Sequence, residues 1–528
     1  MTSLHERERP GRDPSAAAVT SRSWTATGQL RWVDPAAVGG IALVVYALHG
    51  FDGVLNRDFG VFTYGGLRIA HGGSSYVDVF NSVGPLSDTV PGLAIWVGHL
   101  VGLDPILSAR LLETVISALC CSLLCVLARD VLGSRTAGLV APAVFLTFTK
   151  FLELASDGPR DKTTMVLFLL GCLVLLVRRR WGAAGVCAAL ATLTWQPALA
   201  VAAAALAAAL LVDHEERRPW IVLRFLAGGL VPSLVTVGYF LGVGALRTAL
   251  DGFVVINALY TTQPSLLTAS GHIARIMWAG YGWTLPIAIG GLVALVALGA
   301  RAMPQALRPS GTTRAPGLVI CGAGGLAGVV WTTLVVNGAP DLFVVLPFAA
   351  LGVSAAVVLI LQRAPRRPGR YAVAAVVSAG VLTAGIVSVS TRDDRLDLQR
   401  ADVAAVLATE PTNATVLSLS APEVLALSGR TDPTGYQIMT RPQDRYLSAR
   451  YPGGLAGFLR TLVSTHATFV AVGNGADVGF ARSWLQADYW PIAGQQAGWQ
   501  WYLNRSAGLG ALERAQTAQD EVVSAYRS

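Results

Sequence analysis

Long apolar runs separated by short polar segments make up most of the chain between residue 36 and about residue 390. Many of these runs approach the roughly 20 residues that an apolar helix needs to cross a bilayer. The pattern predicts a polytopic α-helical membrane domain over residues 36–390, with about eleven transmembrane helices. The predicted spans are 36–52, 105–128, 137–153, 163–178, 182–196, 197–213, 221–243, 278–299, 317–336, 342–361 and 371–390.

Residues 391–528 follow a different pattern. Residues 391–399 are rich in charge, and short apolar strand patterns at 416–420, 468–473 and 499–503 then alternate with segments of helical spacing. Such alternation is typical of a small sheet with helices packed on it. We therefore predict a small C-terminal α/β domain over residues 391–528.

The N-terminal residues 1–35 precede the first apolar run. Their early part is rich in Ser, Arg, Pro and Glu, and they lack the apolar centre of a signal peptide. This composition predicts a disordered cytoplasmic tail.

Arginine sets the predicted orientation, because the cytoplasmic loops of membrane proteins are enriched in Lys and Arg. All arginine clusters fall on one side of the membrane when eleven helices are counted, and that side is then the cytoplasm. We therefore expect a multi-pass plasma-membrane protein with a cytoplasmic N-terminus and an extracytoplasmic C-terminal domain. The clusters are Arg129 with Arg135; Arg178, Arg179 and Arg180; Arg217, Arg218 and Arg224; Arg301, Arg308 and Arg314; and Arg363, Arg366, Arg367 and Arg370.

The apolar segment 85–103 is not counted as a span. It contains Asp88 and His99, and counting it would invert the side on which every later arginine cluster lies. We predict an interfacial or re-entrant helix there, within an outer loop formed by residues 53–104.

Composition narrows the class of protein. Hydrophobic residues make up 53% of the chain and charged residues only 14%, against roughly a quarter charged in an average soluble domain. The net charge of +8 comes from arginine between the apolar runs, so it does not indicate nucleic-acid binding. All six cysteines lie inside apolar runs, where neither an exported disulfide nor a zinc cluster is expected.

Asp58 is the leading candidate for catalysis. It lies a few residues beyond the first apolar run, among Phe59, Phe62 and Tyr64. A carboxylate at such an interface is costly and therefore usually functional, and it could accept a proton as a general base. The alternative is an acid that caps the helix that follows, and spacing does not separate the two interpretations.

A second polar segment contains Asp157, Arg160, Asp161 and Lys162. Under the predicted orientation it lies on the same outer face as Asp58. Two cations beside two acids could hold a phosphate group, and Asp157 and Asp161 are candidates for substrate binding. The alternative is a solvated turn around Gly158-Pro159 in which Asp161 caps the next helix.

Four further polar residues, Tyr76, Asp78, Tyr260 and Asp341, are expected on this outer face and are candidates for substrate binding. Each one alone is more typical of a helix cap or an interface anchor. The sequence contains no Walker A loop, no dinucleotide-binding fingerprint beside a strand and no GxSxG elbow. Cytoplasmic ATP is therefore not implied as an energy source.

The first loop resembles that of the GT-C glycosyltransferases. It resembles in particular their protein-O-mannosyltransferase and aminoarabinose-transferase-like branch, whose bacterial members are often described as dolichol-phosphate-mannose mannosyltransferase-like. The resemblance covers residues 36 to about 390, is looser at Asp157 and at Pro340-Asp341 with Leu346-Pro347, and does not include the C-terminal domain. The matching residues of the first loop are Asp58, Gly60, Tyr64, Gly72, Gly73, Tyr76, Asp78, Phe80, Gly84, Pro85 and Leu86.

One departure from the family pattern concerns the lipid phosphate. Where relatives often have Lys-Pro-Pro, this chain has Val83-Gly84-Pro85, so the lysine that contacts the phosphate is missing. Arg57, Arg160 or Lys162 could take its place.

The resemblance implies an inverting membrane glycosyltransferase of the cell envelope. It would transfer a sugar from a polyprenyl-phosphate donor to a glycan, lipid or protein acceptor on the outer face, with Asp58 as general base. No cofactor is certain, and a need for a divalent cation is left open. The alternatives are a lipid or sugar transporter or flippase, and a non-catalytic cell-envelope assembly protein. In the C-terminal domain the polar residues Asp432, Tyr436, Arg441, Asp444 and Arg445 are expected to form a solvated loop.

Overall fold

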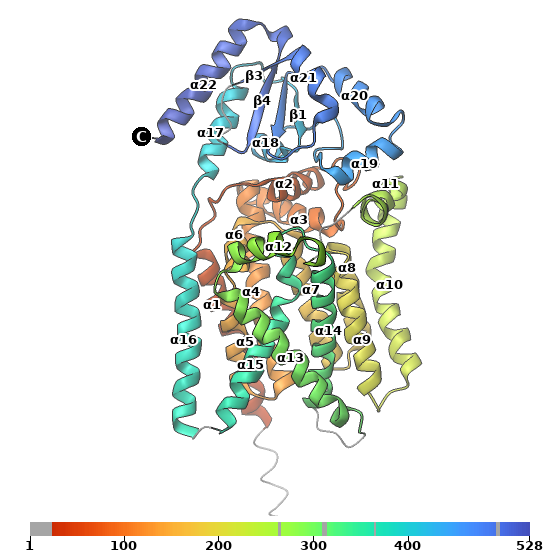
Figure 1. Cartoon of the computed structure of the whole chain (residues 1–528), viewed down its shortest axis with the longest axis vertical. Coiled ribbons are helices and arrows are strands. Elements are labelled where there is room, and N and C mark those ends of the chain that lie inside the picture. Colours follow the sequence, from red (N-terminus) through yellow and green to blue (C-terminus); the bar gives the residue numbers. More distant parts are fainter. Residues whose placement is uncertain (1–23, 262–265, 309–313, 364–365, 493–496, 528) are drawn as a thin grey trace, which may run out of the picture.

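The apolar runs of the sequence become helices that stand side by side in a bundle (Figure 1). The structure, a computed structural model, describes residues 24–261, 266–308, 314–363, 366–492 and 497–527. A helix lies over each predicted span, although one span is broken in two. These helices are α1 (Trp24–Ala47), α4 (Pro105–Leu132), α5 (Arg135–Leu146), α6 (Thr149–Asp157), α7 (Asp161–Val177), α8 (Trp181–Thr194), α9 (Ala198–Val212), α10 (Arg218–Gly242), α13 (Thr284–Ala306), α14 (Arg314–Leu334), α15 (Leu346–Arg363) and α16 (Arg366–Ser390).

Among the described residues, six helices are long and apolar enough to cross a membrane: α4, α10, α13, α14, α15 and α16. The bent pair of α5 and α6 would make a seventh span. Helices α8 and α9 are apolar but shorter, with 14 and 15 residues. The predicted total of about eleven spans therefore stays a prediction.

The first helix extends into the predicted N-terminal tail. Helix α1 begins at Trp24, inside the tail 1–35 that was expected to be disordered; residues 1–23 of that tail lie outside the described residues. Asp34 pairs with Arg135 at 2.7 Å and with Arg129 at 3.5 Å. These ion pairs hold the part of α1 that precedes its apolar run against the bundle.

The predicted span 137–153 bends by 75° between α5 and α6, and the two helices together are still long and apolar enough for one span. The bend turns Phe148 and Phe151 into the core, where both pack against Phe145, with ring centroids 6.1 and 4.6 Å away. The gain from burying two aromatic rings favours the break over a straight helix.

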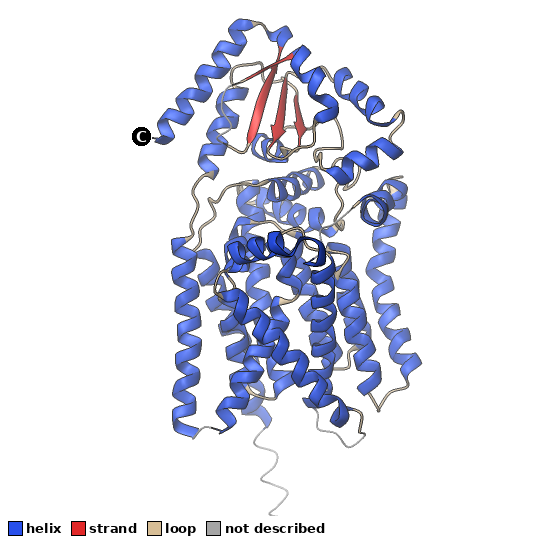
Figure 2. Ribbon diagram, viewed as in Figure 1, coloured by secondary structure: helices blue, strands red, loops and turns tan. Residues whose placement is uncertain are grey.

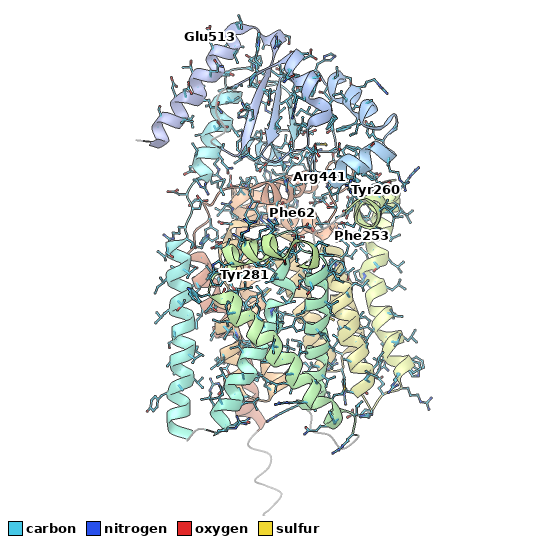
Figure 3. All side chains as sticks on the ribbon, viewed as in Figure 1. Phe62, Phe253, Tyr260, Tyr281, Arg441 and Glu513 are labelled. Atoms are coloured by element: carbon cyan, nitrogen blue, oxygen red, sulfur yellow. The ribbon has the colours of Figure 1, made fainter. Side chains whose placement is uncertain are left out.

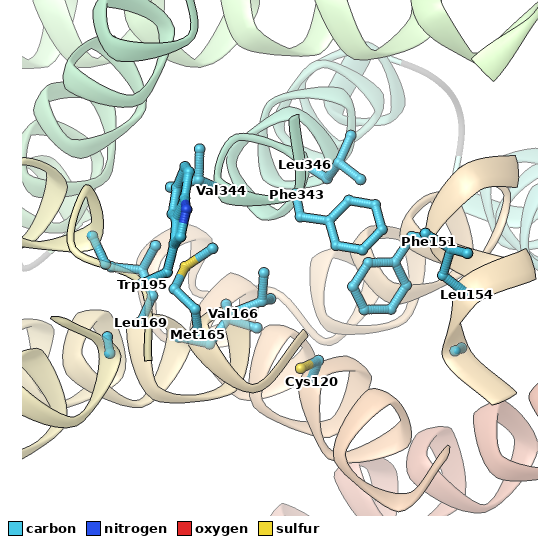
Figure 4. Close-up of a cluster of buried hydrophobic side chains, with 14 of the residues drawn as sticks. Cys120, Phe151, Leu154, Met165, Val166, Leu169, Trp195, Phe343, Val344 and Leu346 are labelled. Atoms are coloured by element: carbon cyan, nitrogen blue, oxygen red, sulfur yellow. The ribbon is translucent and has the colours of Figure 1, made fainter. Parts of the chain in front are cut away.

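A buried apolar cluster fills the bundle below the end that faces the C-terminal residues (Figure 4). Phe151 of α6 and Phe343 contact each other with ring centroids 4.8 Å apart. Met165, near the start of α7, and Trp195, after α8, lie in the same cluster. The first turn of α7 therefore rests on closely packed side chains.

Shorter helices cross the end of the bundle that faces the C-terminal residues (Figure 1). Helices α2 and α3 pack on each other so closely that a Cβ at Gly66 would lie 2.9 Å from the amide nitrogen of Gly92. Helix α3 covers most of the segment 85–103, where the sequence predicts an interfacial or re-entrant helix. The elements of this end are α2 (Arg57–Ala70), α3 (Leu86–Leu100), α11 (Leu246–Leu250), the π-helix η2 (Asp251–Tyr260), α12 (Leu266–Tyr281) and the 3-10 helix η3 (Ala339–Val344).

The C-terminal residues form a sheet flanked by helices, called here the C-terminal unit (Figure 2). The strand order is β1-β2-β4-β3; β1 pairs with β2 in parallel, and β4 is antiparallel to β2 and β3. The strands are β1 (Val416–Leu419), β2 (Phe469–Gly473), β3 (Tyr489–Pro491) and β4 (Trp499–Asn504). The helices are α17 (Leu396–Leu407), α18 (Pro422–Ser428), α19 (Arg441–Arg450), α20 (Gly454–Ser464), α21 (Arg482–Asp488) and α22 (Leu509–Arg527).

The C-terminal unit docks on α2 through α18. A Cβ at Gly60 of α2 would lie 2.7 Å from the amide nitrogen of Glu423, so only glycine permits this approach. Nearby, the hydroxyl of Tyr64 accepts a hydrogen bond from the Asp432 amide at 3.0 Å. Asp432 is 5% exposed, and burial raises its pKa to about 7. The expectation that this residue belongs to a solvated loop is therefore wrong.

The close contact between α2 and α18 at Gly60 can be tested by substitution. The side chain of a Gly60→Val variant would force α18 away from α2, and overpacking of this kind costs about 1–3 kcal/mol. We expect a lower thermal midpoint and faster proteolysis between α16 and α17. Gly238→Val is the matched control, because it places the same side chain in a helix where no atom lies within 4 Å. Equal behaviour of the two variants would contradict the proposed docking.

Candidate functional site

A cavity of about 460 Å³ lies between the C-terminal unit and the end of the bundle that faces it. Figure 3 labels Phe62 of α2, which lines it from the bundle side, and Arg441, where α19 begins on the opposite side. Its walls come from α2, the loop after Phe80, the first residues of α7, η2, the turn before η3 and the segment before α19. Residues far apart in the sequence therefore meet here.

Asp58 faces this cavity from the first turn of α2. The helix is capped by Asn56 instead, whose Oδ1 accepts a hydrogen bond from the Phe59 amide at 3.0 Å. The alternative interpretation of Asp58 as the capping residue is therefore wrong. An acid in the first turn is still favoured by the helix dipole, and its carboxylate remains available for other contacts.

Arg160 holds the carboxylate of Asp58. One terminal nitrogen of its guanidinium donates to Oδ2 of Asp58 at 3.1 Å, and Arg57 lies 3.9 Å from Oδ1. Burial by itself would raise the pKa of Asp58, but the charges of Arg160, Lys162 and Arg57 together outweigh it and hold that pKa below its usual value. The side chain is 47% exposed, and it lies in the wall of the cavity. The result is an ionised carboxylate that a bound ligand can reach.

The cations at the start of α7 differ in how firmly they are held. Arg160 is 8% exposed, and its Nε is buried without a hydrogen-bond partner among the described residues. The ammonium group of Lys162 lies 3.2 Å from Asp341 and 3.8 Å from Asp161, and 5.5 Å from the ring centroid of Trp195. Asp341 also accepts the Asn337 amide at 2.6 Å, which fixes its own position.

The charges in the cavity wall balance. Three cations, Arg57, Arg160 and Lys162, face three carboxylates, Asp58, Asp161 and Asp341. Arg57 makes the loosest of these contacts and is 37% exposed, so it is the cation most available to an incoming anion. Among the described residues, no group of three or more His, Cys, Asp or Glu side chains is placed to hold a metal ion.

Four residues predicted to bind substrate do not line this cavity in the described part of the chain. They hold other parts of the structure instead. Tyr76 is buried and donates to the Val83 carbonyl at 2.6 Å, Asp78 pairs with Arg68 at 3.0 Å, Asp157 lies 3.4 Å from His49, and Tyr260 accepts a hydrogen bond from Arg450 at 3.4 Å. Tyr76 still acts on the cavity indirectly, because its hydroxyl holds Val83 in the wall.

No sequence pattern singles out Arg110, which is fully buried in α4. Its guanidinium donates to the carbonyls of Phe51, of Gly53 at 2.7 Å and of Asp157 at 3.1 Å. These carbonyls belong to the two segments that lead into Asp58 and Arg160. A buried arginine needs several acceptors, and only the folded chain brings these acceptors together.

The sequence also missed the residues of the C-terminal unit that close the cavity. Segment 438–443 contributes Ile438, Thr440, Pro442 and Gln443, here called the roof. Their neighbours Tyr436, Arg441 and Asp444 stand out by aromatic character or charge, whereas these four uncharged residues carry no such signal. Their proximity to Asp58 depends on the docking of α18 on α2, which no local pattern encodes.

Comparisons with known proteins point to one fold. No protein-family profile matches the sequence, and no curated protein matches it either. The crystal structure of ArnT from Cupriavidus metallidurans in the apo state is similar, with a TM-score of 0.62 and 14% identity over 91% of this chain and 99% of that one. The same protein bound to undecaprenyl phosphate gives a TM-score of 0.59 and 14% identity, over 90% and 98% of the two chains.

This likeness extends over the bundle and the C-terminal unit, because nine-tenths of the chain is covered. It agrees with the resemblance that the residues of the first loop suggest. The chain has the fold of the GT-C membrane glycosyltransferases.

Proposed function

We propose that this protein is an inverting membrane glycosyltransferase. It transfers a sugar from a polyprenyl-phosphate carrier to an acceptor on the outer face of the plasma membrane. The observation that carries the proposal is the ionised carboxylate of Asp58, held by Arg160 in the wall of a cavity at one end of the bundle. The ArnT structure with bound undecaprenyl phosphate supports a carrier of this chemistry.

The lipid phosphate would bind among the cations of the cavity. Arg160 and Lys162 lie at the start of α7, whose remaining residues are almost all apolar. They therefore occupy the depth at which a lipid headgroup meets water. Val83, at the position where relatives have lysine, also lines the cavity, so Arg57 and Arg160 would supply the missing charge.

Asp58 would act on the acceptor. The acceptor hydroxyl attacks C1 of the donor sugar, its proton passes to the carboxylate of Asp58, and the bond between C1 and the phosphate oxygen breaks. The polyprenyl phosphate leaves with the bonding electron pair, and Arg160 and Lys162 stabilise the charge that develops on it. Attack from the face opposite the leaving group inverts the configuration at C1.

The position of the charged groups favours transfer over transport. A transporter would be expected to hold ionisable residues near the middle of the membrane, at broken helices. Here Asp58, Arg160 and Lys162 lie at the end of the bundle, beneath the C-terminal unit. That unit would then lie on the extracytoplasmic side, where it closes the cavity and excludes water from the reaction.

The first test is Asp58→Asn. This variant keeps the shape of the side chain and removes the base, so we expect the rate of sugar transfer to fall by about 10²–10⁴-fold. The measurement is release of polyprenyl phosphate from synthetic polyprenyl-phosphate sugars by the purified protein. Asp394→Asn, at an exposed position after α16, is the matched control. Turnover of Asp58→Asn at the wild-type rate would exclude the assigned base.

The second test concerns the phosphate site. Arg160→Ala and Lys162→Ala each remove a charged hydrogen-bond donor, so we expect the KM for the lipid donor to rise about tenfold or more. Lys150→Ala is the matched control, because Lys150 pairs with Glu153 at 2.9 Å and does not line the cavity.

Arg160→Ala should also change the pH profile. Asp58 must be ionised to accept a proton, so activity falls as the pH drops through its pKa. The charge of Arg160 lowers that pKa; without it the pKa rises, and the acidic limb of kcat/KM moves to higher pH. An unchanged donor KM together with an unmoved acidic limb would count against the role of Arg160.

Orientation can be tested with a tag at the C-terminus. Under the proposed topology a protease or an impermeant label added to intact cells reaches the tag. A tag that becomes accessible only after the membrane is opened would place the C-terminal unit in the cytoplasm. The proposed reaction on the outer face would then be wrong.

A further inference from the structure

The two sides of the cavity differ in chemistry. The three cations and three carboxylates all come from α2, from the first residues of α7 and from Asp341 at η3. The roof residues Ile438, Thr440, Pro442 and Gln443 are all uncharged. A ligand that fills the cavity therefore meets ionised groups on one side and neutral polar groups on the other.

Gln443 is the roof residue best placed to bind a ligand. It lines the cavity and is only 5% exposed. Its Oε1 accepts a hydrogen bond from the Thr440 hydroxyl, and its amide nitrogen has no acceptor among the described residues. That nitrogen is not among the buried atoms that lack a partner, so it stays accessible beside the cavity, and an acceptor oxygen of a ligand can replace water there.

The surroundings hold Gln443 in a fixed position. It lies in the first turn of α19, one turn before Tyr446. The hydroxyl of Tyr446 donates to Asp251 of η2 at 3.1 Å, and its ring stacks on Phe80 with centroids 5.0 Å apart. These contacts fasten α19 to the bundle, and the hydrogen bond from Thr440 holds the side chain of Gln443 itself.

We propose that Gln443, oriented by Thr440, is a specificity-determining residue that binds the hydroxyl groups of an uncharged glycan acceptor. This inference rests on the proposed glycosyltransferase function. The lipid donor is confined to the charged side by its phosphate, so the second substrate occupies the side formed by the C-terminal unit. A volume of about 460 Å³ falls within the usual range for small-ligand pockets.

The absence of charge in the roof determines which acceptors fit. A sugar with an amino or carboxylate group against Ile438, Pro442 and Gln443 would lose its hydration without gaining an opposite charge, and such burial is unfavourable. Hydroxyl oxygens, in contrast, accept hydrogen bonds from a side-chain amide without this penalty. The roof therefore selects neutral sugars over amino sugars and uronic acids.

Binding can be tested without catalysis. Full-length protein in lipid nanodiscs is titrated with methyl glycosides of mannose, glucose, galactose and arabinose, and with methyl glucuronide, and binding is followed by saturation-transfer NMR. We expect at least one neutral glycoside to bind better than the glucuronide. Gln443→Ala and Gln443→Glu should weaken that binding about tenfold, the loss expected for one hydrogen bond.

Gln486→Ala is the matched control, because Gln486 is exposed on α21 of the same unit. Gln443→Glu keeps the acceptor for Thr440 but replaces the amide donor with a carboxylate, so the thermal midpoints of both Gln443 variants are measured as well, and values equal to that of the wild type exclude a folding defect. Wild-type affinity in both Gln443 variants, preference for the glucuronide, or no binding by any neutral glycoside would overturn the inference.

Transfer assays distinguish this inference from the proposed function. With a donor that the wild-type protein uses, Gln443→Ala should raise the KM for the neutral acceptor about tenfold and leave the donor KM unchanged. Normal acceptor KM in that variant would overturn the role of Gln443 alone. A wild-type protein that transfers no sugar from any polyprenyl-phosphate donor would refute the proposed function, and the NMR titration would still decide whether Gln443 binds neutral sugars.

Discussion

The ion pair between Asp58 and Arg160 is the contact on which the arrangement of the site depends. It joins the first turn of α2 to the start of α7, 102 residues further along the chain. Because Asn56 caps α2, the carboxylate of Asp58 is not used by backbone amides and can be held by a cation instead. Without Asp58, the buried guanidinium of Arg160 would lose its carboxylate partner, whereas without Arg160 the half-exposed Asp58 keeps Arg57 and Lys162 nearby.

Other residues at this end of the bundle keep the starts of α2 and α7 in place. Arg110 donates hydrogen bonds to three backbone carbonyls in the segments that precede α2 and α7 and so holds these segments together. Asp341 pairs with Lys162 nearby. The close contact at Gly60 lets the C-terminal unit settle on α2 and bring the roof over the cavity. A charged side formed by the bundle and a neutral side formed by the C-terminal unit thus become two halves of one cavity.

The sequence predicted the parts of this structure that depend on local pattern. Apolar runs located the bundle helices, and the charged residues of two loops identified Asp58, Arg160 and Lys162 as members of one site. Long-range contacts were not predictable in this way. The bend between α5 and α6 follows from the packing of Phe148 and Phe151. The roof was missed because the position of Gln443 depends on how α18 meets α2. Four other residues predicted to bind substrate contact different parts of the structure instead: Tyr76, Asp78, Asp157 and Tyr260.

The most direct test of the central claim is a cryo-electron-microscopy structure of the protein in nanodiscs with undecaprenyl phosphate. The account predicts phosphate density inside the cavity, in hydrogen-bond contact with Arg57 or Arg160, and beside Asp58. A phosphate bound elsewhere on the protein, with the cavity left to solvent, would contradict the assignment of this ion-paired site to a lipid-linked sugar donor.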